Sequence, residues 1–187
     1  MGLGILIGIV SIILIMVVVI YNGIITRMNA VERGWATVIT QERQKNKMIP
    51  HLEQVTEQFK QHEMGLQSSI AELRSGLARL QASTIDTAAL QQVEGSTQKL
   101  LQGLTVAVEA YPELKASEIF NNLMREIAEQ QENIGAAIRI FNQNVEDFNN
   151  GIEVFPNSLV NAMLNKKTRV TPFHDSEAEA GFEYKLK

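Results

Sequence analysis

The stretch LGILIGIVSIILIMVVVI, residues 3–20, decides the fold of this chain. It contains no charged side chain, and Ser11 carries its only hydrogen-bonding side chain. At a rise of about 1.5 Å per residue, a helix over this stretch is about 27 Å long, which is enough to cross the hydrocarbon core of a bilayer. A lone strand would leave its backbone groups unpaired in lipid. The sequence therefore predicts a transmembrane helix within residues 1–26.

A cleaved signal peptide is the alternative interpretation of this stretch. Such a peptide has a basic start, a shorter apolar run and a cleavage site made of small residues. No Lys or Arg precedes Arg27, and residues 20–27 contain no such site. Tyr21 is typical of the membrane interface, where aromatic rings are enriched. We therefore expect an uncleaved anchor that leaves the membrane near Tyr21.

Basic residues follow the anchor closely and predict its orientation. Arg27, Arg33, Arg43, Lys45 and Lys47 come after it, whereas only the α-amino group precedes it. Because cytoplasmic flanks of membrane spans are enriched in Lys and Arg, we expect the C-terminal part in the cytoplasm and the N-terminus outside.

Composition excludes several classes of function. The chain has 187 residues, with 17 Lys and Arg against 21 Asp and Glu, so its formal net charge is −4. This balance argues against nucleic acid as a partner, since no basic excess is present. The chain has no cysteine. Disulfides, thiolate metal ligands and cysteine nucleophiles are therefore all excluded.

Residues 27–80 are predicted to form one long helix. From Leu52 onward the apolar residues recur at steps of three or four, which is typical of a helix in a bundle. Pro50 removes a backbone hydrogen bond and clashes with the preceding turn. Because the apolar pattern resumes at Leu52, we expect a kink at Pro50 in a continuous helix. The polar residues 41–47 are interpreted as a solvated section of this helix.

Three further helices are predicted beyond a small-polar connection at residues 81–86. Asp86 or Ser83 is a suitable cap for the first of them. The acidic tail that follows contains aromatic residues and is expected to be partly docked: Phe173, Phe182 and Tyr184. The predicted helices cover residues 87–110, 117–152 and 158–166.

The sequence thus predicts an all-α protein. Short connections place consecutive helices antiparallel. We expect a single N-terminal transmembrane helix followed by an elongated antiparallel bundle of three long helices and a short C-terminal one. The predicted domains are an anchor at 1–26, a helical bundle at 27–168 and an acidic tail at 169–187.

No catalytic, cofactor-binding or metal-binding residues are predicted. His51, His62 and His174 are the three histidines, and the first two would lie about 16 Å apart on one helix, too far to share a metal ion. The motifs His-Glu-x-x-His, Glu-x-x-His, Gly-x-Ser-x-Gly and Gly-x-x-x-x-Gly-Lys are missing from the sequence. Glu53 and Glu57 share a helix face and are interpreted as solvated surface.

His62 and Gln131 each interrupt an otherwise apolar helix face. One interpretation is a polar pair that fixes the register of the bundle. The other is a proton-sensitive or ligand-contacting site. The sequence leaves both interpretations open.

In its order of motifs, the chain resembles the LemA family of bacterial membrane-anchored helical proteins. The resemblance covers about residues 1–165, and its motifs are Tyr21-Asn22, Val31 with Trp35, Ile49-Pro50 with Leu52, His62-Glu63, Tyr111-Pro112-Glu113-Leu114-Lys115-Ala116, Phe120, Glu132-Asn133-Ile134, Arg139, Asn142, Asn149 and Phe155-Pro156-Asn157. The resemblance implies an anchor followed by a helical bundle. It implies no agreed enzymatic activity, and roles in membrane organisation or envelope quality control are proposed for the family.

These observations favour a non-enzymatic, membrane-anchored scaffold or adaptor in the bacterial inner membrane, with a single span. The alternative is a peptide- or small-molecule-binding subunit of a membrane complex, such as one that includes a membrane protease. The expected partners are the lipid bilayer and other membrane proteins. Gly4 and Gly8 form a small-xxx-small motif, which also favours association of copies through the anchor.

Overall fold

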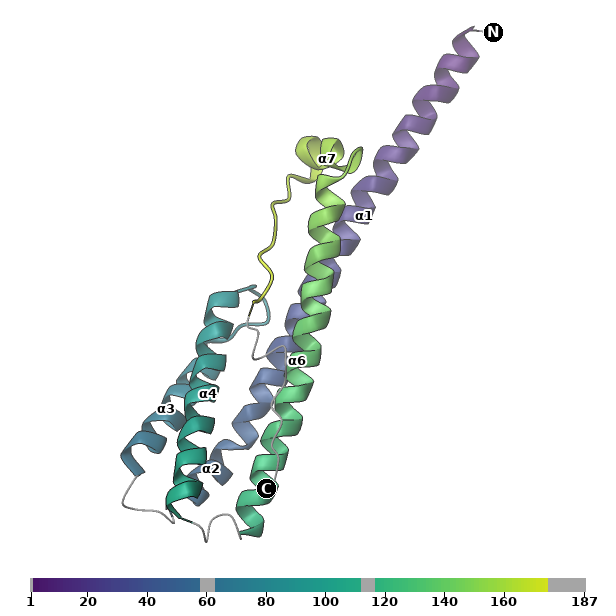
Figure 1. The fold of residues 1–187 in the computed structure, drawn as a ribbon. Coiled ribbons are helices and arrows are strands. Elements are labelled where there is room, and N and C mark those ends of the chain that lie inside the picture. The colour runs from purple at the N-terminus through teal and green to yellow at the C-terminus, as the bar shows by residue number, and fades with distance from the viewer. Residues whose placement is uncertain (1, 58–62, 112–116, 175–187) are drawn as a thin grey trace. The chain divides into compact units, whose positions relative to one another are not determined.

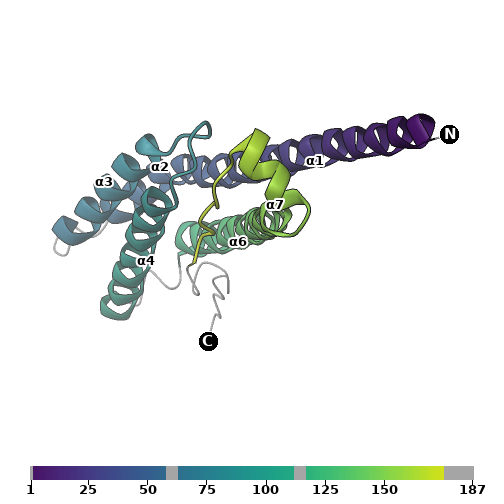
Figure 2. The ribbon, with the colours of Figure 1, turned by 90° about the horizontal axis from the view of Figure 1, so that it is seen from above.

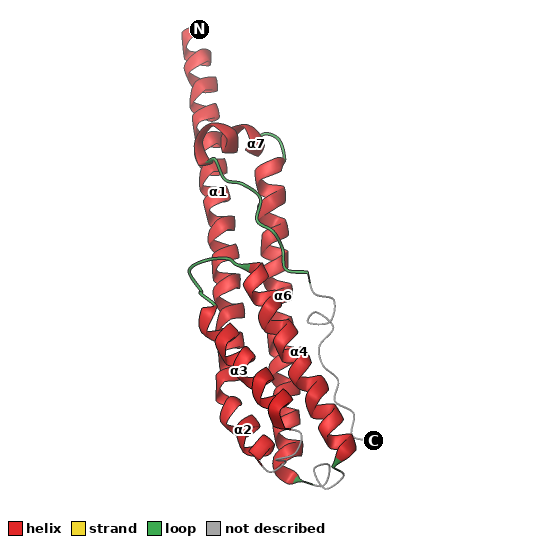
Figure 3. Ribbon diagram, turned by 90° about the vertical axis from the view of Figure 1, so that its left-hand side faces the viewer, coloured by secondary structure: helices red, strands yellow, loops and turns green. Residues whose placement is uncertain are grey.

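The computed structural model describes residues 2–57, 63–111 and 117–174. Within these ranges all regular secondary structure is helical, as Figure 3 shows. The chain divides into two compact units. We call Met1–Gly34 with Ile140–Pro172 the anchor unit, and Trp35–Arg139 with Phe173–Lys187 the bundle unit.

The helices follow one another in the order labelled in Figure 1. Their bounds are α1 Gly2–Gln44, the 3₁₀ turn η1 Lys45–Lys47, α2 Ile49–Glu57, α3 Glu63–Arg79, α4 Thr87–Ala110, α6 Glu118–Glu153, α7 Asn157–Val160 and the π-helical turn η2 Asn161–Asn165. The prediction of an all-α fold with a long apolar N-terminal helix is confirmed. That helix is long and apolar enough to cross a membrane, and none of its most apolar stretch is buried.

In the anchor unit, the C-terminal part of α6 packs antiparallel to α1. Asn144 donates a hydrogen bond from Nδ2 to the carbonyl of Ala30 at 3.2 Å. A Cβ atom at Gly34 would lie only 3.2 Å from the Cα atom of Phe141. Glycine at this position therefore lets the two helices approach closely, and the Phe141 side chain is fully buried.

In the bundle unit, α2 and α3 pack side by side as a helical hairpin (Figures 1 and 2). The predicted single helix over residues 27–80 is therefore wrong. Arg43 donates a hydrogen bond from Nη2 to the carbonyl of Leu80 at 2.8 Å. In one straight helix these two residues would lie about 55 Å apart. Residues 27–80 therefore do not form one straight helix.

The physical reason for this error is that periodicity carries no information about direction. Both arms of the hairpin present apolar residues at steps of three and four, so the pattern reads the same with or without a reversal. Folding back allows each arm to bury its apolar face against the other. Leu52, Val55, Ile70, Leu73 and Leu77 are all buried.

The junction before Pro50 differs from the predicted kink in one continuous α-helix. The α-helical hydrogen bonding of α1 ends at Gln44, and a 3₁₀ turn precedes α2. Gln44 and Met48 both have right-handed helical dihedrals, so the chain does not form an extended loop at this junction. Pro50 has no N–H to donate to Asn46. It becomes the second residue of α2, where a missing donor removes no bond within that helix.

Three further predicted features are confirmed. The backbone N–H of Ala89 donates to Asp86 Oδ1 at 2.9 Å, so Asp86 caps α4. At the far end of the chain, α7 and η2 occupy the predicted short helix and end at Lys166, which has a φ of 51°. Phe173 is buried, so this part of the tail is docked, while Phe182 and Tyr184 lie outside the described residues.

Candidate functional site

Two charged side chains of the polar stretch 41–47 are buried in the bundle unit. Glu42 is 0 % exposed and Lys45 is 4 % exposed, so the interpretation of this stretch as solvated is wrong for both residues. The spacing explains their positions. The buried residues Val38, Ile39 and Met48 lie one turn before and one turn after them, so Glu42 and Lys45 continue the same helix face.

Lys45 lies at the centre of a buried charge cluster that also contains Glu42, Glu94, Thr97 and Gln131. Its Nζ atom lies 2.6 Å from Glu94 Oε1, 2.9 Å from Glu42 Oε2 and 3.1 Å from Thr97 Oγ1. Gln131 donates from Nε2 to Glu94 Oε2 at 3.2 Å. The members come from α1, η1, α4 and α6, so the cluster joins segments that are distant in the sequence.

The protonation of the cluster follows from its burial. Two ionised carboxylates and one ammonium would leave a net charge of −1 without solvent. Burial raises the pKa of Glu42 well above its usual value, and the nearby Glu94 carboxylate adds to this effect. Burial also acts to raise the pKa of Glu94, but Lys45 and the hydrogen bonds to the carboxylate outweigh it and lower this pKa to about 2.

The ammonium group of Lys45 stays charged. Burial acts to lower its pKa, but the two carboxyl groups outweigh burial, and the pKa of Lys45 is raised. At pH values below the raised pKa of Glu42, the cluster therefore contains a Lys45–Glu94 ion pair and a neutral Glu42 carboxyl group. A cluster of this composition has no net charge, which is the state that burial favours.

These shifts predict a stability that changes with pH in two opposite directions. The pKa of Glu42 is higher in the folded state than its ordinary value of 4.5, so its contribution is complete below that value and is lost as pH rises through the folded pKa. The pKa of Glu94 is lower, about 2 against 4.5, so its contribution is complete above 4.5 and is lost as pH falls toward 2.

Glu42→Gln should therefore remove the loss of stability at rising pH and keep the loss in acid. Urea unfolding of the full chain in detergent micelles, followed by the fluorescence of Trp35, the only tryptophan, measures this. Glu32→Gln is the matched control, because Glu32 is exposed on the same helix. A Glu42→Gln profile that matches the wild type on the alkaline side would contradict the assignment of a neutral carboxyl group.

Of the two residues predicted to interrupt the apolar faces, only Gln131 is described. It is buried, as its place in the helix face predicted, and its partner in the described part of the chain is Glu94. His62 lies outside the described residues, so the His62–Gln131 pair stays a prediction. The other two histidines are exposed, and His51 Nδ1 lies 3.8 Å from Glu126 Oε2.

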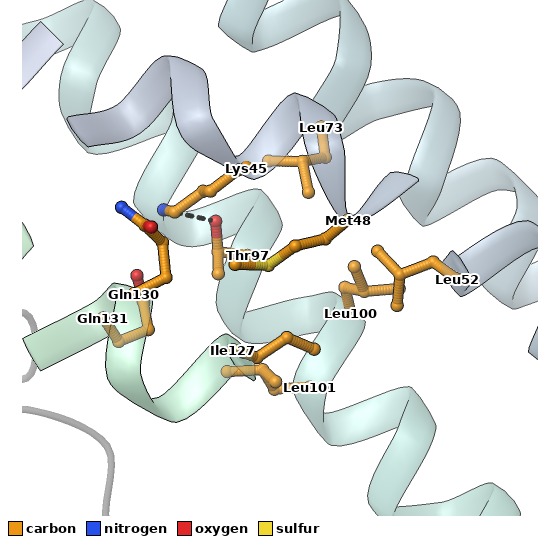
Figure 4. Close-up of a pocket in the computed structure, with 10 residues that line it drawn as sticks. All are labelled: Lys45, Met48, Leu52, Leu73, Thr97, Leu100, Leu101, Ile127, Gln130 and Gln131. Atoms are coloured by element: carbon orange, nitrogen blue, oxygen red, sulfur yellow. Dashed lines mark hydrogen bonds between the residues drawn. The ribbon is translucent and has the colours of Figure 1, made fainter. Parts of the chain in front are cut away.

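A small cavity adjoins the buried charge cluster. Its volume is about 20 Å³, which is room for about one water molecule. Figure 4 shows Lys45 and Thr97 at one side of it, with their hydrogen bond drawn, and Met48 and Leu100 nearby. Its walls are formed by Lys45, Met48, Leu52, Leu73, Thr97, Leu100, Leu101, Ile127, Gln130 and Gln131.

A larger open groove lies in the anchor unit. Its volume is about 420 Å³, and it is lined by residues of α1 and α6. Arg27 and Asp147 provide charges of both signs, and two asparagine side chains add further hydrogen-bonding groups. The lining residues are Arg27, Ala30, Asn144, Asp147, Asn150, Gly151 and Val154.

The buried charge cluster was not predicted, although one signal in the sequence points to it. Glu42 follows the apolar residue Val38 by four residues, and Lys45 and Met48 follow at steps of three, so these positions remain on one helix face. Nothing in α4 marked Glu94 as the partner. Chemically, an enclosed ion pair of this kind favours one arrangement of the helices, because a shifted helix would leave a charge buried without its partner.

The sequence is similar to known proteins over most of its length. The sequence profile of the LemA family matches residues 34–181. Protein LemA of Metamycoplasma hominis (strain ATCC 23114 / DSM 25592 / NBRC 14850 / NCTC 10111 / PG21) is 24 % identical over 158 residues, which cover 84 % of this chain and 70 % of the relative. The family match extends over most of the chain, including all of α2, α3, α4 and α6, and on that basis this protein belongs to the LemA family.

Proposed function

We propose that this protein is a non-enzymatic scaffold or adaptor anchored in the bacterial inner membrane by a single span. The observation that carries the proposal is the exposed apolar stretch at the start of α1, none of which is buried. In water such a stretch would be costly to expose, whereas in lipid it is stable. The same helix continues to Gln44, so the span and the bundle unit share one element.

The chemistry of the buried charge cluster supports a structural role over a catalytic one. Catalytic acids and bases need access to a substrate. Glu42, Lys45 and Glu94 are each at most 4 % exposed, and the adjoining cavity of about 20 Å³ fits about one water molecule. The cluster thus contributes to the specificity of the bundle, and the surfaces of the helices remain for binding partners.

A peptide- or small-molecule-binding subunit of a membrane complex is the second candidate. The open groove of about 420 Å³ in the anchor unit favours it, because Arg27, Asp147 and the two asparagines can bind polar groups of a ligand.

A pull-down of the full chain in mild detergent discriminates the two candidates. A scaffold should retain one or more membrane proteins in amounts comparable to its own, because its function is to hold them. An unrelated single-span protein with the same tag is the control. A low-mass compound recovered in comparable amount, without a protein partner, would instead support the binding subunit and contradict the scaffold.

The proposed topology places the bundle unit in the cytoplasm, because Arg27, Arg33 and Arg43 follow the span. The chain has no cysteine, so single substitutions introduce unique labelling sites. Gly2→Cys should react with a membrane-impermeant maleimide in intact cells, and Leu186→Cys should react only after the cells are opened. Labelling of Leu186→Cys in intact cells would reverse the assigned orientation.

A further inference from the structure

Five large apolar side chains are exposed in the anchor unit directly after α6. Phe155 is 82 % exposed and Met163 is 67 % exposed. Exposed apolar residues are common one at a time, but a group on consecutive turns indicates a surface that is covered in the functional state. The members lie on the last residues before α7, on α7 and on η2: Val154, Phe155, Leu159, Met163 and Leu164. We call residues 154–164 the interfacial segment.

Asparagine side chains hold this segment in place through the backbone. Asn157 donates from Nδ2 to the carbonyl of Gly151 at 3.0 Å. Asn161 donates to the carbonyl of Lys167 at 2.9 Å and accepts from its N–H at 3.0 Å. Val160 within the segment is buried, whereas the adjacent Leu159 is exposed. The exposure of the apolar side chains is therefore part of a fixed local structure.

The contacts within the anchor unit place this segment beside α1, close to the C-terminal end of its apolar stretch. Asn144 bonds to Ala30, a Cβ atom at Gly151 would lie 2.7 Å from the Cδ atom of Arg27, and Asn165 donates to the carbonyl of Tyr21 at 3.3 Å. Along this series the partners on α1 approach the apolar stretch that ends at Ile20. Figures 1 and 3 show α7 beside this part of α1.

The residues that follow the interfacial segment are basic. Lys166 and Lys167 come directly after η2, and Arg169 forms an ion pair with Glu153 at 2.9 Å. Long cationic side chains are suited to the boundary of a bilayer, where their stems contact apolar groups and their charges reach the headgroups. The segment thus combines an apolar surface with a basic border at the level of Tyr21.

From this arrangement we infer that the interfacial segment binds the surface of the bilayer that α1 spans. Phe155, Leu159 and Met163 enter the boundary between headgroups and hydrocarbon, and Lys166 and Lys167 lie at the headgroups. The inference rests on the proposed function, because it requires α1 to span the membrane. It adds a second contact with lipid, which does not span the bilayer and lies just after the C-terminal end of α6.

Nitroxide labels on single cysteines test this contact in the full chain. The protein is reconstituted into vesicles of three parts phosphatidylcholine and one part phosphatidylglycerol. Labels at Phe155→Cys and Met163→Cys are exposed in turn to oxygen, which concentrates in lipid, and to a water-soluble nickel chelate. Ile12→Cys is the reference for the span. Ile140→Cys is the matched control, because Ile140 is an exposed apolar residue on α6 in the same unit.

The expected result is that the labels at 155 and 163 are relaxed more by oxygen than by nickel, as at position 12, while the label at 140 shows the reverse. If the labels at 155 and 163 behave like the label at 140 while the label at 12 remains in lipid, the inference is wrong, but α1 still spans the membrane. If the label at 12 is itself relaxed more by nickel than by oxygen, α1 does not span the membrane, and both the proposed anchor and the inference are wrong. Labels at 155 and 163 that are shielded from both reagents would show that a protein surface covers the segment, which also overturns the inference.

Discussion

Replacing Lys45 with methionine should lower the free energy of unfolding by about 3–5 kcal/mol, as expected when one partner of a buried ion pair is removed. Methionine keeps the unbranched stem of the side chain but leaves Glu42 and Glu94 without a cation, at 0 % and 1 % exposure. Urea unfolding of the full chain in detergent micelles, followed by Trp35 fluorescence, measures the loss. Lys47→Met is the matched control, because Lys47 lies in the same 3₁₀ turn and is exposed.

The sign of the pH effect separates a lost ion pair from a lost packing contact. Without Lys45, the pKa of both carboxyl groups should be raised by burial, so the folded state should bind more protons than the unfolded state. The free energy of unfolding of Lys45→Met should therefore rise as pH falls toward 4.5, the ordinary pKa of both groups. A loss equal to that of Lys47→Met, or one that does not change with pH, would contradict the central role of Lys45.

Phe141→Ala should cost about 3–5 kcal/mol of stability, as large-to-small substitutions of buried aromatic residues do. Phe141 is 0 % exposed, and its backbone packs directly against Gly34, so the helices have little freedom to close the resulting cavity. The same urea titration measures this loss. The neighbouring residue provides the control: Ile140 is 57 % exposed, and Ile140→Ala should change stability by less than about 0.5 kcal/mol. Equal effects of the two substitutions would show that the wrong face of α6 had been assigned to the core.

The local elements of this fold could be predicted from the sequence because each depends on short-range chemistry. The charge-free run from Leu3 to Ile20 predicts a helix able to cross a membrane, and Asp86 predicts the start of α4. The three- and four-residue steps from Phe120 to Ile152 predict the buried face of α6. In all three cases the information lies within a few turns of the helix concerned.

The reversal between α2 and α3 and the buried charge cluster depend on contacts between distant residues. The apolar period is the same on both arms of the hairpin, so it cannot indicate that Arg43 reaches the carbonyl of Leu80. Glu42 and Lys45 were assigned to solvent because charged residues are seldom buried alone. Their burial requires Glu94 as a partner, and one helix does not reveal the charges on the next. The helical spacing alone favours the buried face for Glu42 and Lys45, whereas their charged side chains favour solvent.

The separation of the cluster members along the chain has a consequence for the kinetics of folding. Lys45 and Glu94 are 49 residues apart, and Glu94 and Gln131 are 37 residues apart. Until α4 docks, Lys45 lacks Glu94 and has only Glu42 nearby, so its ammonium group keeps much of its water, because dehydrating a charge without its full set of partners is costly. We therefore expect the ion pair to close after the helices have formed and collapsed. Interactions made this late slow the unfolding of the native protein and leave its rate of folding almost unchanged. The cluster should thus extend the lifetime of the folded bundle.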